Sequence, residues 1–455
     1  MARKGDAPSA SDSTTAHPHA PFINRLHAEL LSYIFDLCVE LKSGPAPALR
    51  LAQVCPMWRA LAFDTTSLWE ELFIPWEQFY SGAIPGPARQ VEEWFKRAAP
   101  RTLALEIYVP YGWLVDDYVA ELEVLQDPQV FPTHRLRELT MPLDLLERTE
   151  LVRRRASVFP VLQSLHLYVL EDDSIRLDAP LEAFRDCPCL RQVHLDLAGD
   201  NGGHADENFP LPWASLRTLY LVVGSEDAGM NIVHDCTNLE TLTLEAYNQD
   251  ATPTAAMVTL PRLQSLSLLI DYHLPTWVLR SLALPNLTSF SMVNDMRNLQ
   301  DIAANVHLAA FLARSPRITQ LTLKGVSLQT DAFVLILQCI PALEVLTLDV
   351  HSVEHPDDIL DVLTATHDAP VPCRNLVQLN MRIDGLGHNK TQAFMERFIV
   401  MVHSRCNTRD VTCEVACLRH VQVWTQHEFV QGGTGWCGRL MQLQDDDLEI
   451  DVYNS

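Results

Sequence analysis

Positive charge is scarce in this sequence. The chain carries 34 lysine and arginine residues against 58 aspartate and glutamate residues, so its formal net charge is −24 at pH 7. Such an acidic surface repels phosphate backbones and anionic lipids, which argues against nucleic acid and membranes as partners. The one tight basic run, residues 153–155, is more typical of a solvated helix face than of a nuclear address.

Long apolar runs are also missing. The best stretch, residues 333–340, is far shorter than the roughly 20 apolar residues that span a bilayer. Residues 1–20 are rich in Ser, Thr, Ala, Pro and His and contain no apolar signal-peptide core, which predicts a disordered N-terminal lead. Eleven cysteines without a secretion signal favour reduced thiols in a cytoplasmic or nuclear protein.

Recognisable catalytic motifs are absent. The sequence contains neither a P-loop nor a Gly-x-Ser-x-Gly motif. Gly433, Gly435 and Gly438 match the dinucleotide fingerprint in letters, but the 17 residues after Gly438 are too few for the required βαβ unit. We therefore expect no enzymatic activity and no cofactor, and an enzyme ranks last among the functions considered.

One cluster of residues has the composition of a zinc site. It consists of His403, Cys406, Cys413, Cys417 and His420. However, Cys413 and Cys417 alternate with other residues in a way that indicates the inward face of a strand. Buried thiols explain this pattern without a metal, so we expect no metal site.

Two apolar stripes at helical spacing open the ordered chain. The first runs from Leu26 to Cys38 and the second from Leu51 to Leu61, separated by a Ser-Gly-Pro-Ala-Pro segment at residues 43–47. The spacing predicts two or three short helices that share a small core within residues 21–74.

The order of residues in these stripes is more specific. It reads L-x-x-E-L-L-x-x-I-F from Leu26, then L-x-x-V-C-x-x-W-R-x-L-A from Leu51, then Ser-Leu-Trp from Ser67. This order resembles the F-box, in the version common in large families of fungal F-box proteins, over about 50 residues. The resemblance implies that the segment docks onto a Skp-family adaptor, and through it onto a cullin–RING ubiquitin ligase. The adaptor contacts or their immediate support would be Leu26, Leu30, Ile34 and Trp58.

One departure from the family pattern lies at the start of the first helix. The family usually has Leu-Pro where this chain has Leu26-His27. Because proline presets the backbone of the first helical turn, His27 lowers the expected preorganisation and the expected adaptor affinity.

A hexad of the form Leu-x-x-Leu-x-Leu then recurs along the chain. Its eleven copies begin at Leu136, Leu162, Leu190, Leu216, Leu239, Leu263, Leu287, Ile318, Leu343, Leu376 and Leu418. Successive starts lie 23 to 42 residues apart, and the early spacings match leucine-rich repeats. A single repeat cannot bury its own apolar stripe, so the repeats must stack.

These patterns predict an α/β chain: a small all-α F-box module followed by a leucine-rich-repeat solenoid with a parallel concave sheet and convex helices. The expected divisions are a lead at 1–20, the F-box-like domain at 21–74 and a linker with a short helix at 75–100. The solenoid is expected at 101–425, and a loop with an acidic tail at 426–455. The convex helices with the clearest periodicity are expected at 302–314, 331–339, 357–366 and 391–404.

The candidate partner surface is the concave face. Residues that flank the inward leucines of each hexad point out of the sheet, and most of them are small and polar. The bulky exceptions cluster on three successive strands and are His166, Tyr168, His194 and Tyr220. We expect these four residues to contact a protein substrate.

The leading hypothesis is a non-catalytic substrate receptor of a cullin–RING ligase, in which other subunits carry out the ubiquitin chemistry. One alternative is an F-box scaffold that binds the adaptor, or another partner, without directing degradation. Another is a repeat interaction protein whose N-terminal helices only cap the solenoid.

Overall fold

The computed structural model describes most of the chain outside its longer connections. The described residues are 23, 26–40, 47–75, 87–109, 132–147, 158–169, 180–197, 209–224, 226–246, 257–270, 276–294, 302–326, 328–350, 355–365, 372–383, 388–406, 415–425, 435–444 and 447–454. The expected disordered lead and the basic run at 153–155 lie outside these ranges.

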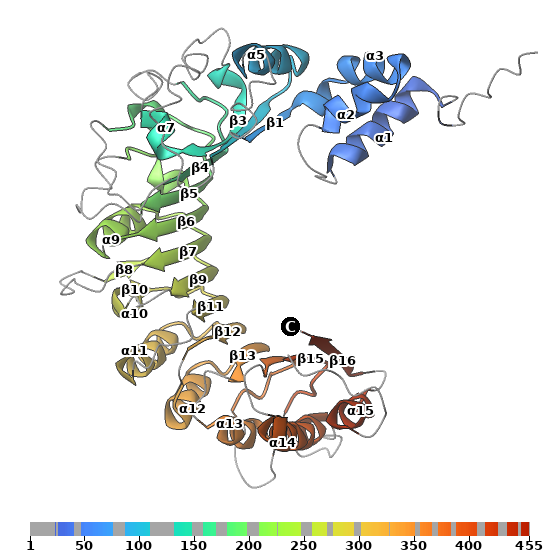
Figure 1. Ribbon diagram of the computed structural model, residues 1–455. Helices are drawn as coiled ribbons and strands as arrows, with labels where there is room; N and C mark the ends of the chain where they lie inside the picture. The colour runs from blue at the N-terminus through green and yellow to red at the C-terminus, as the bar shows by residue number, and fades with distance from the viewer. Residues whose placement is uncertain are drawn as a thin grey trace, which may run out of the picture.

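One parallel sheet of 14 strands organises the described structure (Figure 1). Its strands, in both chain order and spatial order, are β1 (Glu71–Pro75), β2 (Leu103–Tyr108), β3 (Leu136–Pro142), β4 (Ser164–Tyr168), β5 (Gln192–Leu197), β6 (Thr218–Val223), β7 (Thr241–Ala246), β9 (Ser265–Ile270), β11 (Ser289–Asn294), β12 (Gln320–Lys324), β13 (Val345–Asp349), β14 (Gln378–Arg382), β15 (His420–Thr425) and β16 (Glu449–Asn454). A separate short pair joins β8 (Val258–Thr259) to β10 (Leu282–Ala283). The predicted leucine-rich-repeat solenoid is confirmed.

A shared backbone acceptor locks each repeat to the one before it. In the repeat at β6, the amides of Arg217 and Thr218 both donate to the carbonyl oxygen of Arg191, at 2.8 and 3.0 Å. The amides of Glu240 and Thr241 do the same to the carbonyl of Arg217, and the pattern continues to the carbonyl of Val377. Because each carbonyl has two lone pairs, one peptide oxygen can satisfy two amides at the bend into the strand.

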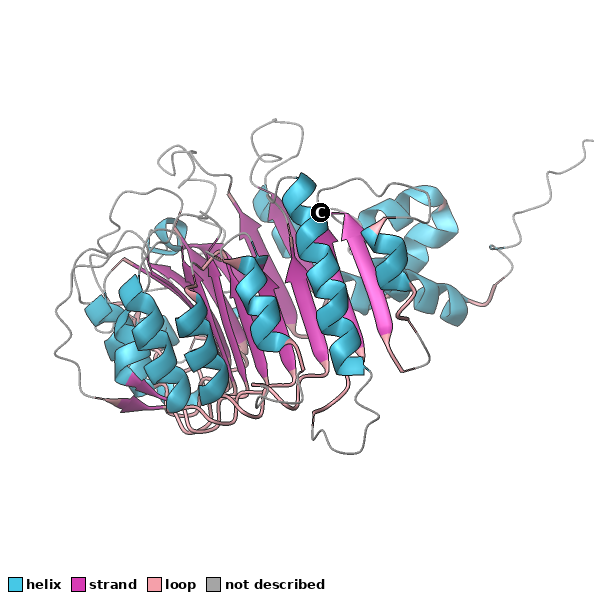
Figure 2. Ribbon diagram, turned by 90° about the horizontal axis from the view of Figure 1, so that it is seen from below, coloured by secondary structure: helices cyan, strands magenta, loops and turns pink. Residues whose placement is uncertain are grey.

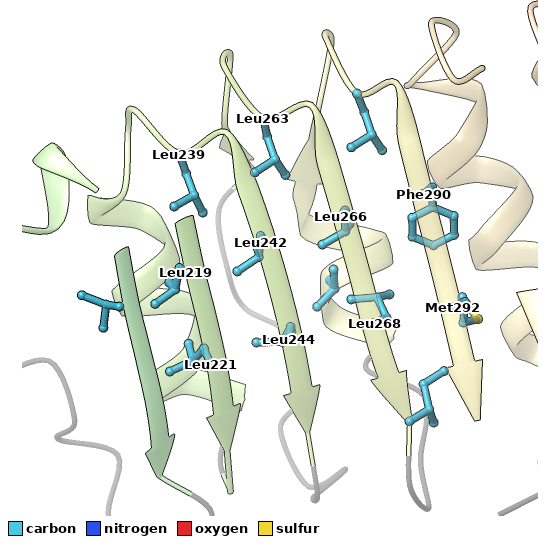
Figure 3. Close-up of a cluster of buried hydrophobic side chains, with 14 of the residues drawn as sticks. Leu219, Leu221, Leu239, Leu242, Leu244, Leu263, Leu266, Leu268, Phe290 and Met292 are labelled. Atoms are coloured by element: carbon cyan, nitrogen blue, oxygen red, sulfur yellow. The ribbon is translucent and has the colours of Figure 1, made fainter. Parts of the chain in front are cut away.

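The leucines of the hexads form continuous buried rows across the strands. Figure 3 shows three such rows, with Leu239 and Leu263 at the bend, Leu242 and Leu266 along the strands, and Phe290 extending the second row. The side chains of Leu219, Leu221, Leu242, Leu244, Leu266 and Leu268 are completely or almost completely buried. Each leucine therefore packs beside the equivalent residues of its two neighbours.

Among the described residues, the opposite wall of the core holds short 3₁₀ turns before β5 and β6 and longer helices in the late repeats. Early repeats use the 3₁₀ turns η6 (Glu182–Phe184) and η7 (Trp213–Ser215), followed by α9 (Glu226–Asp235) and α10 (Thr276–Ser281). Later repeats use α11 (Ile302–Ala313), α12 (Thr330–Cys339), α13 (Pro356–Leu363) and α14 (His388–Cys406), which agree with the four predicted helices. Figure 2 shows these helices side by side on one face of the sheet.

The N-terminal module consists of α1 (Ala28–Glu40), α2 (Pro47–Val54), α3 (Pro56–Asp64) and the 3₁₀ turn η2 (Thr66–Trp69). Figure 1 places it at the β1 end of the arc. Buried Trp69 donates its indole N–H to the carbonyl of Ala62 at 2.8 Å. This bond fixes the indole against the last turns of α3.

Trp69 also joins the module to the solenoid. Its ring lies 4.6 Å from that of Trp94 in α5 (Pro87–Arg97), in an edge-on arrangement. The guanidinium of Arg97 lies 4.7 Å from the Trp69 ring and 4.3 Å from that of Phe63. Strand β1 begins two residues after Trp69, so the module and the sheet share one hydrophobic core.

The sheet is longer than the sequence predicted. The segment 426–455 was expected to be a loop and an acidic tail, and this is wrong for its described part, which contains α15 (Trp436–Met441) and β16. Leu448 and Ile450 are 2% and 3% exposed because their alternation with acidic residues fits a strand buried on one face. At the other end, β1 overlaps the end of the segment 21–74, which was expected to be purely helical, and it pairs in parallel with β2.

We predict that Leu242→Asp opens the central repeats. Leu242 is 0% exposed and sits in a row of leucines, so the variant buries a carboxylate without an ionic partner. A cost of about 3–5 kcal/mol is expected for such a change. Circular dichroism melts should show a large loss for Leu242→Asp. Thr241→Asp, on the same strand but on the half-buried opposite face, should change the melting temperature little.

Candidate partner-binding surfaces

The strand register arranges the concave face in three columns. Outward positions of neighbouring strands face one another across the whole sheet. The middle column reads Phe73, Glu106, Thr140, His166, His194, Tyr220, Thr243, Ser267, Ser291, Thr322, Thr347, Asn380, Gln422 and Asp451. From Thr243 to Thr347 this column holds only serine and threonine.

Three aromatic rings stack in the middle column, on β4, β5 and β6. The ring centroids of His166 and His194 are 3.8 Å apart with their planes 8° from parallel. Those of His194 and Tyr220 are 3.9 Å apart at 38°. We refer to His166, His194 and Tyr220 as the ring ladder. Strands in a sheet lie about 4.8 Å apart, so rings at the same position of successive strands come into face-to-face contact.

Burial keeps both imidazoles of the ring ladder neutral near pH 7. It lowers the pKa of His166 from its ordinary value. It lowers the pKa of His194 to about 4, and the neighbouring His166 contributes because two stacked imidazolium ions would repel each other. The ladder is therefore an uncharged π surface under physiological conditions.

Tyr168, the fourth predicted contact residue, has a structural role. Its hydroxyl donates to the carbonyl of Ile107 at 2.9 Å and accepts from the amide of Val109 at 3.1 Å. It thereby ties β4 to the end of β2, across the intervening Pro142 of β3. Desolvation of the hydroxyl raises the pKa of Tyr168 to about 12.

A carboxylate lies at the edge of the ring ladder. The hydroxyl of Tyr220 donates to Oε2 of Glu245 on β7 at 2.9 Å. Thr243, the residue of β7 that faces Tyr220 in the register, is small. The aromatic stack therefore ends at Tyr220, beside an acidic side chain.

A second candidate surface lies on α1. Leu30, Tyr33 and Leu37 are 53%, 63% and 42% exposed, and Leu26 precedes them at 38%. The spacing of three and four residues places Leu30, Tyr33 and Leu37 on one face of α1, and Leu26, two residues before the helix begins, continues the spacing. The opposite face of the same helix buries Leu31 and Phe35. We refer to Leu26, Leu30, Tyr33 and Leu37 as the exposed stripe.

The predicted adaptor-contact residues divide between the exposed stripe and the core. Leu26 and Leu30 belong to the stripe, and Ile34 is half-buried beside it. Trp58 is also half-buried, with its ring 4.9 Å from that of buried Phe35. Trp58 therefore supports the packing of α3 on α1.

Sequence reasoning missed part of the exposed apolar surface. The apolar stripe from Leu26 to Cys38 was expected to line a small core, whereas α1 has a buried face and an exposed one. Tyr33, Leu37 and Met57 were not singled out, and Met57 is 43% exposed. Val54, which was expected to belong to the second apolar stripe, is 59% exposed at the α2–α3 junction. The signal was available, since apolar residues too numerous for one face must leave some exposed.

A ladder of side chains at the turns was also missed. Asn238, Asn286 and Asn375 immediately precede the first leucine of their hexads. Each donates its amide to a backbone carbonyl of the preceding repeat, at 2.7, 2.7 and 3.2 Å respectively. These turn residues therefore supply side-chain hydrogen bonds from one repeat to the next.

The described residues contain no group of three or more His, Cys, Asp or Glu side chains that could hold a metal ion. Of the cysteine cluster, Cys413 lies outside the described residues. Cys417 is exposed in a non-strand segment that precedes β15, so the predicted buried strand face is wrong at this position. Among the helices that the structure describes, none combines the length and the apolar character that a membrane span requires.

Comparisons with known proteins return structural neighbours only. No family model and no curated protein matches the sequence. Among solved structures, the leucine-rich repeat-containing protein LegL7 of Legionella pneumophila has 14% identity and a TM-score of 0.36, covering 66% of this chain and 97% of that one. A Bacteroides fragilis protein has 12% identity and a TM-score of 0.34, over 74% and 80% of the two chains.

A leucine-rich repeat protein of Leptospira interrogans is similar at 13% identity, with a TM-score of 0.31 over 86% of this chain and 87% of that one. Similarity at this level carries no argument about what the present chain binds.

We predict that Tyr168→Phe destabilises the chain, because the variant leaves the carbonyl of Ile107 and the amide of Val109 without the hydroxyl. The expected loss is about 1–3 kcal/mol in urea unfolding. Tyr108→Phe is the matched control: Tyr108 is 48% exposed and stacks on Phe73, so its loss should stay within about 0.5 kcal/mol. Equal effects of the two changes would contradict the structural role of Tyr168.

The ring ladder should make stability depend on pH. Because the folded pKa of His194 is about 4, below its value in the unfolded chain, the unfolded state binds more protons between these values. Stability should therefore fall as the pH is lowered from about 6.5 towards 4. The decrease in urea midpoint between about pH 7 and pH 5 should be smaller in His194→Gln than in the wild type. A variant of exposed His134 should keep the wild-type decrease.

Proposed function

We propose that this chain is a non-catalytic receptor that docks onto a Skp-family adaptor of a cullin–RING ubiquitin ligase through residues 26–69 and holds a protein partner with its solenoid. The observation that carries the proposal is the exposed stripe on α1, in a segment whose residue order resembles the F-box. Exposed apolar residues at one helical spacing are unfavourable in an isolated soluble chain and mark an interaction surface. An apolar helix face of this kind fits a hydrophobic groove on a partner.

The distribution of exposed apolar side chains supports this assignment. Among the described residues, 16 large apolar side chains are exposed, and eight of them fall within residues 23–57. These eight are Ile23, Leu26, Leu30, Tyr33, Leu37, Leu49, Val54 and Met57. The solenoid needs no such surface to be capped, since the module joins it through buried Trp69 and Trp94 instead.

The start of α1 bears on the family's usual proline. The carbonyl of His27 accepts from the amides of Leu30 and Leu31 at 3.0 and 3.1 Å, so His27 occupies the N-cap and the helix begins at Ala28. Histidine at this position keeps the first turn hydrogen-bonded. The departure from Leu-Pro therefore leaves the exposed stripe in place.

We predict that Leu30→Asp weakens adaptor binding without unfolding the chain. Leu30 is 53% exposed, so a carboxylate there stays solvated until it meets the adaptor. Desolvating it in an apolar interface should weaken binding by at least about 2 kcal/mol, or roughly 30-fold. Purified chain and Skp-family adaptor should be compared by isothermal titration calorimetry.

Leu335→Asp on α12 is the matched control, because Leu335 is 54% exposed but belongs to the convex side of the solenoid. It should bind the adaptor as the wild type does. If the folded wild-type chain shows no adaptor binding at micromolar concentration, the ligase role is wrong. When adaptor and cullin are both present, a complex of the chain with the adaptor but without the cullin would favour a scaffold that directs no degradation.

A further inference from the structure

The two halves of the concave face differ in charge. In the described parts of β1–β7, the charged residues of the three outward columns are all acidic: Glu71, Glu106, Glu138, Asp196 and Glu245. Glu138 is paired with Arg137 at 3.0 Å. From β12 onward the same columns also contain Lys324 and Arg382. The acidic residues Asp349, Glu449 and Asp451 stand in the same later columns. A cationic partner is therefore matched better by the N-terminal half, whose columns hold no lysine or arginine.

The ring ladder gives that half a specific recognition element. Because the rings of His166, His194 and Tyr220 stack along the column, the faces of the inner ring are covered and those at the two ends point along the sheet. Beyond Tyr220 the next position is Thr243, and beyond His166 it is Thr140, both small. A planar group lying over Thr243 would continue the stack by one rung.

An acidic side chain flanks the same position. Glu245 is two residues beyond Thr243 on β7, so the two side chains share the outward face of that strand. Its Oε2 is held 2.9 Å from the hydroxyl of Tyr220, which directs the carboxylate towards the end of the ladder. A planar cation over Thr243 would meet a ring face on one side and this carboxylate at its edge.

We propose that the concave face of β4–β7 binds an arginine-containing segment of a partner protein, with one guanidinium stacked on Tyr220 over Thr243 and paired with Glu245. A guanidinium is planar, so it stacks on aromatic faces and donates two parallel hydrogen bonds to a carboxylate. The ammonium of lysine pairs with a carboxylate only as a point charge and has no plane to stack. The neutral imidazoles behind Tyr220 add no repulsion. The net charge of −24 draws such a partner towards the chain.

This inference rests on the proposed function in one respect: it takes the solenoid as the part that binds the partner. It adds the chemistry of that partner. It can therefore be tested without the adaptor. Fluorescence anisotropy would measure the full-length chain against three labelled nonapeptides that alternate serine with arginine, lysine or glutamate. At about physiological ionic strength, the arginine peptide should bind at least about fivefold more tightly than the lysine peptide. The glutamate peptide should not bind.

Three variants localise the site. Glu245→Gln keeps the hydrogen bond from Tyr220 but removes the charge, and Tyr220→Leu removes the ring face. Each change should weaken binding of the arginine peptide by roughly three- to tenfold. Thr243→Tyr fills the proposed rung and should weaken it at least as much. Thr322→Tyr, in the same column on β12, is the control and should change binding by less than about twofold. Melting curves show which variants remain folded.

The inference is overturned if the arginine and lysine peptides bind equally, if the glutamate peptide binds as well, or if folded Thr243→Tyr binds arginine normally. No binding of any peptide overturns it too. Adaptor titrations on the same preparations separate the two proposals. Intact adaptor binding with no arginine preference rejects the arginine site alone, and arginine binding without adaptor binding rejects the ligase role alone.

Discussion

Mutual burial of equivalent leucines by neighbouring strands is the constraint on which the rest of this structure depends. No repeat has enough apolar surface to enclose its own leucines, so each one is stable only between two others. The same stacking that buries Leu242 inside forces outward residues of successive strands into columns on the other face. The core and the candidate binding surface are thus two consequences of one register.

That register explains why residues far apart in the sequence act together. His166, His194 and Tyr220 lie on separate repeats, yet one column position brings their rings to 3.8 and 3.9 Å. In the middle column, the positions from Thr243 to Thr347 carry only serine and threonine, so the stack of rings ends at Tyr220. Because the columns differ in charge between the two halves of the sheet, one solenoid offers two chemically distinct surfaces.

The sequence was sufficient for features that follow from periodicity. The inward leucines, the four late helices and the clustering of His166, His194 and Tyr220 could all be read from spacing. Geometry beyond the spacing could not. Nothing in the sequence indicated that the Tyr168 hydroxyl bonds to Ile107 and Val109, since that depends on how β2 ends. The last strand was missed because the three aspartates at 445–447 obscured the alternation of Leu448, Ile450 and Val452.

The fused junction at Trp69 has a consequence for distance. Since the strands follow chain order and the helical module continues directly into β1, a position on the sheet is separated from α1 by a fixed count of rungs. Inserting or deleting one repeat would move everything beyond it by one strand spacing, about 4.8 Å, along a curved path. The number of repeats therefore sets the distance between α1 and any position on the sheet, in steps of one strand spacing.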